Sequence, residues 1–171
     1  MDDVYLFEIH YYVKMCLTMT TTQTTQLESD SAIIKALRKR GYRATSQRIA
    51  ICRVAMANHE HPTARSIHRG VKKLHPTVSL ATVYKTLQVL RDNQLVQELA
   101  FSQTETRFDS NVRPHANLLC SQCGEISDVD DQSITNLVTT VASKSKFAIM
   151  GQRFDIYGIC EKCAKKRRTS P

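Results

Sequence analysis

Apolar residues recur every three or four positions between residues 30 and 92, and this spacing predicts four successive helices. Three of them begin at residue types that commonly cap helix N-termini: Asp30 or Ser31, Thr45, and Ser79. The third follows Pro62-Thr63 and ends before Pro76, because proline disfavours helix in the residue preceding it. The apolar faces are Ile33, Ile34 and Leu37; Ile49, Cys52 and Met56; Ala64, Ile67, Val71 and Leu74; and Leu80, Val83, Leu87 and Leu90.

Two strand-like segments follow the helices, at residues 95–101 and 105–108, with polar residues between them. Helices packed on a small hairpin indicate a winged helix-turn-helix. The second half of the chain has a different pattern, in which strands alternate with one helix. The predicted strands are residues 117–120, 125–129 and 148–159, and the helical stripe is Ile134, Leu137, Val138 and Val141.

These patterns predict an α+β protein with two domains. Residues 29–101 should form a winged-helix domain, residues 102–109 a hinge, and residues 110–164 an α/β domain. Residues 165–171 are a basic tail whose role the sequence leaves open.

Residues 1–28 contain a polar low-complexity stretch and are expected to be a flexible N-terminal extension. A short amphipathic helix in the first 19 residues is the alternative. Met15 and Met19 are alternative start positions to Met1.

The composition is that of a globular protein, with 42% hydrophobic and 23% charged residues. The most apolar stretch, residues 5–17, is interrupted by Glu8, His10 and Lys14, and the first charges are acidic, unlike those of a secretion signal. We therefore expect a soluble, cytoplasmic protein. Residues 30–100 hold 13 Lys and Arg against four acids, which favours either a polyanionic partner or a merely solubilising surface.

Four of the six cysteines form two Cys-x-x-Cys pairs, Cys120 with Cys123 and Cys160 with Cys163, separated by 36 residues. Two such pairs supply the four thiolates that close the coordination of a structural zinc ion. A disulfide framework is the competing interpretation, but it fits a chain without a secretion signal poorly. The remaining cysteines, Cys16 and Cys52, match no ligand partner.

The fourth predicted helix carries polar side chains opposite its apolar stripe. Lys85 and Arg91 can neutralise phosphates, and Tyr84 offers a hydroxyl and an apolar ring to a base. This layout suits a DNA-recognition helix, although a solvated helix face has the same polarity. The candidate DNA-binding residues are Ser79, Thr82, Tyr84, Lys85 and Gln88 on this helix, with Arg43, Arg48 and Arg65 as backbone contacts.

Several of these segments, taken in order, make the chain similar to the ferric uptake regulator family over about residues 31–163. The matching segments are Gly41-Tyr42-Arg43-Ala44-Thr45-x-Gln47-Arg48, His61-Pro62-Thr63-Ala64, Ser79-Leu80-Ala81-Thr82-Val83-Tyr84, Arg107-Phe108-Asp109, His115, Cys120-x-x-Cys123-Gly124 and Tyr157-Gly158-x-Cys160-x-x-Cys163. The resemblance implies a homodimeric, metal-dependent transcriptional repressor. Its N-terminal winged helix would bind an operator in double-stranded DNA, and its C-terminal domain would dimerise and hold Zn(II) on the four cysteines.

The resemblance also implies a regulatory site for Fe(II) or Mn(II) between the domains, with His61, Asp109, His115 and Asp128 as ligands. Asn117 stands where the family usually has a histidine, and it either offers its amide oxygen or marks a lost ligand. A further metal site of the family needs a later histidine, and none follows His115, so we expect that site to be absent.

An aspartate at position 109 makes the chain resemble the peroxide-sensing branch of the family. In that branch iron-catalysed oxidation modifies a ligand histidine, which here would be His61 or His115. Iron sensing, and sensing of zinc or another metal, are the alternatives within the family. No catalytic motif supports an enzyme, and a zinc-stabilised protein-interaction module leaves the basic segment unexplained. No membrane and no small organic substrate are expected as partners.

Overall fold

The computed structural model describes residues 30–39, 41–101, 105–145, 149 and 151–169. They divide into two compact units, and the division falls between Val112 and Arg113. The predicted N-terminal extension, with Cys16 and the alternative start positions, lies outside the described residues. No helix in the described ranges is long and apolar enough to cross a membrane.

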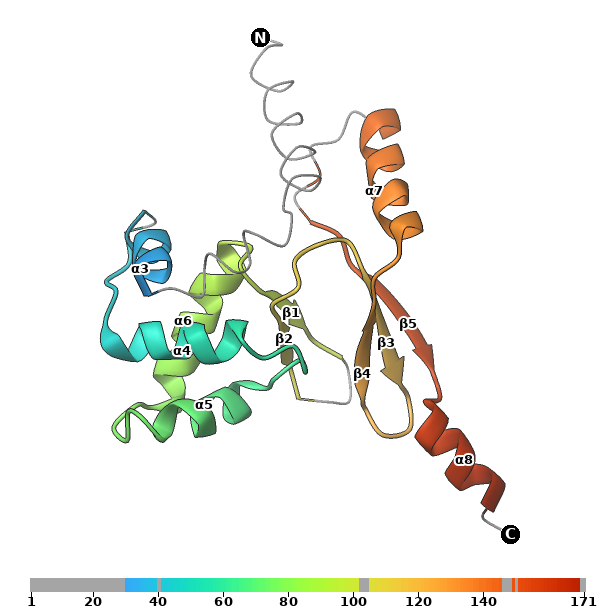
Figure 1. The fold of residues 1–171 in the computed structure, drawn as a ribbon, viewed down its shortest axis with the longest axis horizontal. Helices are drawn as coiled ribbons and strands as arrows, with labels where there is room; N and C mark the ends of the chain where they lie inside the picture. Colours follow the sequence, from blue (N-terminus) through green and yellow to red (C-terminus); the bar gives the residue numbers. More distant parts are fainter. Residues whose placement is uncertain (1–29, 40, 102–104, 146–148, 150, 170–171) are drawn as a thin grey trace. The chain divides into compact units, whose positions relative to one another are not determined.

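The N-terminal unit contains four helices, α3 (Asp30–Lys39), α4 (Ser46–Met56), α5 (Ala64–Lys72) and α6 (Leu80–Asp92) (Figure 1). Thr45, Thr63 and Ser79 cap the last three helices. In each case the side-chain oxygen accepts a hydrogen bond from the backbone N–H three residues later. The four predicted helices are therefore confirmed, and so are the predicted caps Thr45 and Ser79.

The core of this unit consists mostly of the predicted apolar faces. Ile67, Val71, Val83 and Leu87 are fully buried, while Ile49, Met56 and Leu80 pack against the core from partly buried positions. The prediction for Leu74 was wrong, because α5 ends at Lys72 and the Leu74 side chain is 72% exposed. The predicted apolar face of α4 also omitted Ile51, which is completely buried.

A two-stranded hairpin completes the N-terminal unit. Strand β1 (Gln97–Leu99) pairs antiparallel with β2 (Arg107–Asp109), so that Glu98 lies opposite Phe108. Leu99 and Phe108 are buried, and Phe108 belongs to the core cluster that the helices form. Strand β2 uses residues 107–109, within the segment that we expected to link the domains, so this part of the segment is a strand of the wing.

The C-terminal unit is built on a three-stranded sheet of order β4-β3-β5 (Figure 1). Strand β3 (Ala116–Cys120) pairs antiparallel with β4 (Ile126–Val129) and parallel with β5 (Phe154–Gly158). The predicted strands are confirmed at 117–120 and 125–129 with shifts of one residue. The last strand is shorter than the predicted 148–159.

Two helices accompany the sheet. Helix α7 (Gln132–Ser145) carries the predicted stripe, but Leu137 and Val141 on it are 50% and 48% exposed. Helix α8 (Glu161–Thr169) was not predicted, since the basic residues after 164 were assigned to a tail. The carboxylate of Glu161 lies in the first turn of α8, where it complements the helix dipole and pairs with Lys165 one turn later.

The core assignment gives a direct test with a matched control. Leu87→Ala removes a fully buried side chain and should lower the free energy of unfolding of the N-terminal unit by about 2–5 kcal/mol. The same change at exposed Leu74 should cost less than about 0.5 kcal/mol. Urea denaturation followed by circular dichroism measures both, and equal losses for the two variants would contradict the assigned core.

Candidate functional site

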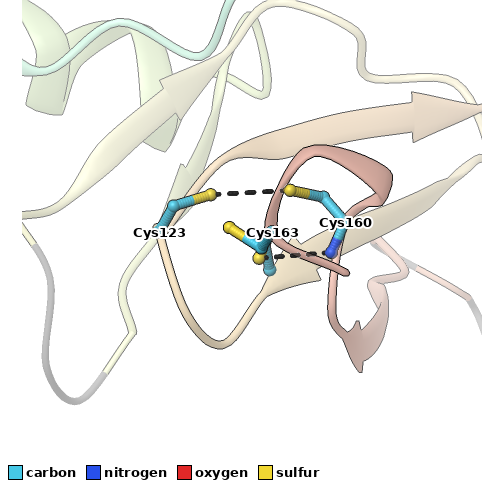
Figure 2. Close-up of side chains that lie close together, drawn as sticks. Cys123, Cys160 and Cys163 are labelled. Atoms are coloured by element: carbon cyan, nitrogen blue, oxygen red, sulfur yellow. Dashed lines mark hydrogen bonds between the residues drawn. The ribbon is translucent and has the colours of Figure 1, made fainter. Parts of the chain in front are cut away.

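The four cysteines of the two Cys-x-x-Cys pairs come together at one end of the C-terminal sheet. Cys120 ends β3, Cys123 lies in the following turn, Cys160 follows β5, and Cys163 lies on α8. Their sulfur atoms all lie within 4.8 Å of one another, and the Sγ atoms of Cys123 and Cys160 are 3.7 Å apart (Figure 2). Four sulfurs at about 2.3 Å from one tetrahedral ion are about 3.8 Å apart, so the cluster fits a zinc site.

Backbone groups prepare one of these sulfurs for metal binding. The Cys160 N–H donates a hydrogen bond of 3.3 Å to Cys120 Sγ. This bond, together with the Cys123 backbone N–H, lowers the pKa of Cys120 to about 6. In contrast, burial raises the pKa of Cys163 to about 12, and the neighbouring sulfurs add to the effect. A divalent cation favours the thiolate form of both, since metal ligands must be deprotonated.

Cys52 provides a contrast within the same chain. It is completely buried on α4, and burial raises the pKa of its thiol to about 12. A protonated thiol in an apolar core is a packing residue and not a ligand. The structure thus brings together the four predicted cysteines and leaves Cys52 in the helical core.

A second group of polar side chains lies on one face of the same sheet. Asn117 is directly opposite Asp128 on β4, and paired residues of adjacent strands point to the same face. His115 lies two residues before Asn117, and its Nε2 is 3.8 Å from Oδ1 of Asp128. Two donor atoms that each lie about 2.1 Å from one ion are at most about 4.2 Å apart, so one ion can bridge this pair.

The hydrogen bond at the other ring nitrogen of His115 fixes its tautomer. Nδ1 is 2.8 Å from the carbonyl oxygen of Arg113, and a carbonyl only accepts hydrogen bonds. Nδ1 therefore carries the proton in the neutral ring, which leaves the lone pair on Nε2, the atom that faces Asp128. Metal-binding histidines are commonly oriented in this way by a backbone carbonyl.

The N-terminal unit assembles a similar pair from two segments that are far apart in sequence. His61 Nε2 lies 4.0 Å from Oδ1 of Asp109, and both side chains are only 2% exposed. Strand β2 brings them together, because Phe108 N–H donates to the Pro62 carbonyl and Thr63 forms a β-bridge with Arg107. The segment that leads into the Thr63 helix cap thus positions His61, and strand β2 of the wing positions Asp109.

The backbone around this pair is constrained. His61 has φ of 50°, in the left-handed region that non-glycine residues rarely occupy. Its carbonyl accepts a hydrogen bond of 3.2 Å from the Arg107 guanidinium, which helps to hold that conformation. Asp109 is held as well, since the same Oδ1 that faces His61 accepts the Asn111 N–H at 2.7 Å. Backbone strain of this kind is concentrated at functional sites in proteins.

The predicted regulatory ligands come from both units. His61 and Asp109 belong to the N-terminal unit, and His115, Asn117 and Asp128 to the C-terminal unit. Sequence reasoning missed Asp155, which lies beside Asn117 on β5. Its position opposite Asn117 depends on the parallel register of β3 and β5, which no local motif encodes.

Helix α6 presents the predicted DNA-reading residues. Tyr84, Lys85 and Gln88 are exposed on one face, while Val83 and Leu87 are buried on the other. Ser79 and Thr82 are joined by a hydrogen bond of 2.9 Å between their hydroxyl groups at the start of the helix. These five candidates therefore lie on or beside the outward surface of one helix.

The basic candidates differ in how their charges are used. Arg43 is exposed, and Arg48 donates to the Arg43 carbonyl at 3.0 Å. Arg65 lies 3.4 Å from a Glu105 carboxylate oxygen in an exposed pair. Arg91, which can neutralise a phosphate, donates to Glu98 at 2.6 Å and also pairs with Asp92. Its charge is therefore compensated within the unit.

Comparison with known proteins gives one consistent family. A family model described as "Ferric uptake regulator family" matches residues 39–157. The chain is 35% identical over 133 residues to the peroxide-responsive repressor PerR of Staphylococcus aureus (strain USA300), which covers 78% of this chain and 90% of the relative.

Solved structures show the same fold. The peroxide stress regulator of Campylobacter jejuni aligns with a TM-score of 0.63 and 29% identity, over 77% of this chain and 98% of the other. The ferric uptake regulator of Helicobacter pylori, described as having three functional metal-binding sites, aligns with a TM-score of 0.66 and 21% identity. That alignment covers 81% of this chain and 93% of the Helicobacter protein.

The cysteine cluster predicts which thiols retain zinc. Cys123→Ser removes one of four ligands at an exposed position, so the protein should lose its zinc and unfold at a lower temperature. Cys52→Ala should keep its zinc, although it loses some core packing. Elemental analysis after dialysis against a chelator measures both, and zinc retention by Cys123→Ser would exclude this ligand set.

Proposed function

Because the chain belongs to the ferric uptake regulator family, whose members are metal-responsive transcription regulators and not enzymes, we propose that it represses transcription by binding an operator in double-stranded DNA when a regulatory metal is bound. The observation that carries this proposal is the presence of one histidine–carboxylate pair in each unit, His61 with Asp109 and His115 with Asp128. As a transcription repressor it would act in the cytoplasm.

The proposed coupling between metal and DNA follows from linkage. An ion that takes ligands from both units favours the arrangement in which all of them can reach it. If that arrangement also suits the operator, DNA binding and metal binding strengthen each other by the same factor. Imidazole and carboxylate ligands suit Fe(II) or Mn(II), whereas the four thiolates select zinc.

The exposed face of α6 is the proposed DNA-reading surface. A recognition helix docks one face on its own domain and presents the other to base edges and phosphates. Tyr84, Lys85 and Gln88 meet this requirement, with Ser79 and Thr82 at the start of the helix. Of the arginine candidates, the exposed Arg43 is the strongest for a phosphate contact, and Arg48 and Arg65 are further candidates.

Members of the family are dimeric, and we propose that this chain forms a homodimer through its C-terminal unit. Strand β5 lies at the edge of the sheet and exposes Ile156 and Tyr157, at 55% and 61%. Helix α7 exposes Leu137 and Val141. An edge strand with large exposed apolar side chains is a surface that proteins normally cover.

The proposed signal is hydrogen peroxide. The relatives described as peroxide-responsive share 35% and 29% identity with this chain. Ferrous iron held by the ligand residues would act as the redox catalyst that activates hydrogen peroxide next to a ligand imidazole. In the net reaction hydrogen peroxide would be the two-electron oxidant: one of its oxygens would be inserted into a ring C–H bond of His61 or His115, and the other would leave as water. A modified imidazole no longer serves as a ligand, so the chain releases DNA.

Iron or zinc sensing without oxidation is the second candidate. The observation that favours it is Asn117, because the third imidazole that the family usually provides is replaced by an amide. In that case the occupancy of the site would follow metal concentration alone.

The DNA surface can be tested through its salt dependence. Lys85→Ala should weaken operator binding and reduce the slope of log affinity against log salt by about 0.9 for each phosphate that the lysine neutralises. Lys144→Ala, a change at another exposed lysine, on α7, should change neither the affinity nor the slope. Fluorescence anisotropy over a salt series measures both variants. An unchanged slope for Lys85→Ala would remove this lysine from the DNA surface.

Peroxide sensing can be tested by peptide mass spectrometry. After treatment of the Fe(II)-loaded protein with hydrogen peroxide, a peptide containing His61 or His115 should gain one oxygen atom, and operator binding should fall. His68 is an internal control, because its Nε2 bonds to the Val78 carbonyl and it belongs to neither ligand pair. Unmodified His61 and His115, with DNA binding that follows Fe(II) concentration, would instead support iron sensing.

A further inference from the structure

Asn117 lies on β3, the central strand of the C-terminal sheet. It lies opposite Asp128 on β4 and opposite Asp155 on β5, so one amide is flanked by two carboxylates on the same face. Only 1% of Asn117 is exposed. Bulk solvent therefore does not reach this amide.

The two ends of the Asn117 amide have different surroundings. Nδ2 donates a hydrogen bond of 3.5 Å to Oδ1 of Asp155. Oδ1 of Asn117 is buried and accepts no hydrogen bond from any of the described residues. A buried acceptor that is left unsatisfied costs about 1–3 kcal/mol, so its presence in a folded protein requires an explanation.

The ion pair between Arg153 and Asp155 fixes which end of the Asn117 amide faces β5. Arg153 contacts both carboxylate oxygens of Asp155, with Nε 3.0 Å from Oδ1 and Nη2 2.7 Å from Oδ2. An ionised carboxylate only accepts hydrogen bonds, so it can face the NH2 group of Asn117 but not its oxygen. The Arg153–Asp155 pair therefore turns the amide oxygen away from β5.

We propose that Asn117 is an amide-oxygen ligand of the regulatory metal, that Asp155 is the residue that positions it, and that this oxygen shifts the metal preference of the site toward Mn(II) and away from Zn(II). The inference rests on the proposed function, since it concerns the same site as His115 and Asp128. Asn117 shares a sheet face with both of these ligands. A cation bound beside His115 and Asp128 would satisfy this buried oxygen of Asn117, because hard cations take oxygen ligands.

The shift in metal preference follows from the chemistry of the donor atoms. Carboxylate and carbonyl oxygens suit Mn(II), whereas imidazole nitrogen suits Zn(II) and Fe(II). Replacing one imidazole by an amide oxygen should lower Zn(II) affinity more than Mn(II) affinity. The chain would then discriminate against zinc at its regulatory site while it holds zinc on its four cysteines.

The test uses full-length protein whose cysteine site already contains zinc, and it measures Mn(II) and Zn(II) binding by competition with a fluorescent chelator. Asn117→Ala should weaken Mn(II) binding by about tenfold or more. Asn117→His should raise the ratio of Zn(II) to Mn(II) affinity by about tenfold or more, the change expected when imidazole replaces the amide oxygen. Retained cysteine-bound zinc shows that each variant is folded.

The positioning role has its own measurement. Asp155→Asn offers an amide that can either donate or accept, so it no longer fixes Asn117, and Mn(II) affinity should fall by about tenfold. The same change in the Asn117→Ala background should have little further effect, because the two residues act through one contact. Asp130→Asn, the same substitution at an exposed position, is the control and should bind like the wild type.

The outcomes separate this inference from the proposed function. If His115→Ala loses Mn(II) while Asn117→Ala and Asp155→Asn bind as the wild type does, the regulatory site stands and the inference is overturned. If His115→Ala also binds normally, the proposed regulatory site itself is wrong. Independent losses for Asp155→Asn and Asn117→Ala would remove the positioning role of Asp155.

Discussion

The register of strand β3 is the constraint on which the chemistry of the C-terminal unit depends. Its side chains alternate between the faces of the sheet, so Asn117 lies on one face and Cys120, three residues later, on the other. A slip of one residue would exchange the two faces and separate both sets of candidate ligands. Pairing with β4 on one side and β5 on the other fixes the register twice.

The N-terminal unit positions its residues by a different means, which is helix packing. The buried faces of α4, α5 and α6 form one core, and this core determines which side of α6 remains exposed. The same packing holds the cap at Thr63, while the bridge from Thr63 to Arg107 ties it to the wing. The candidate recognition residues and the His61–Asp109 pair are thus positioned by elements that pack on the same core.

Local signals in the sequence were enough to predict much of this. The caps Thr45 and Ser79, the apolar stripe of α6 and the two Cys-x-x-Cys pairs each depend on residues within a few positions of one another. Local signals failed where neighbours in space decide the outcome. Leu74 continues the spacing of α5 but lies beyond its end, and its side chain is exposed.

By itself, the sequence determined the kinds of chemistry that the chain can carry, because cysteine spacing, helix periodicity and capping are set by local geometry. The tertiary structure alone decided how the individual groups are arranged. The Arg113 carbonyl fixes which ring nitrogen of His115 carries the lone pair. The Arg153–Asp155 pair orients the Asn117 amide across the parallel strands β3 and β5. Such orientations depend on strand register and on hydrogen bonds across strands, and these exist only once the sheet has formed.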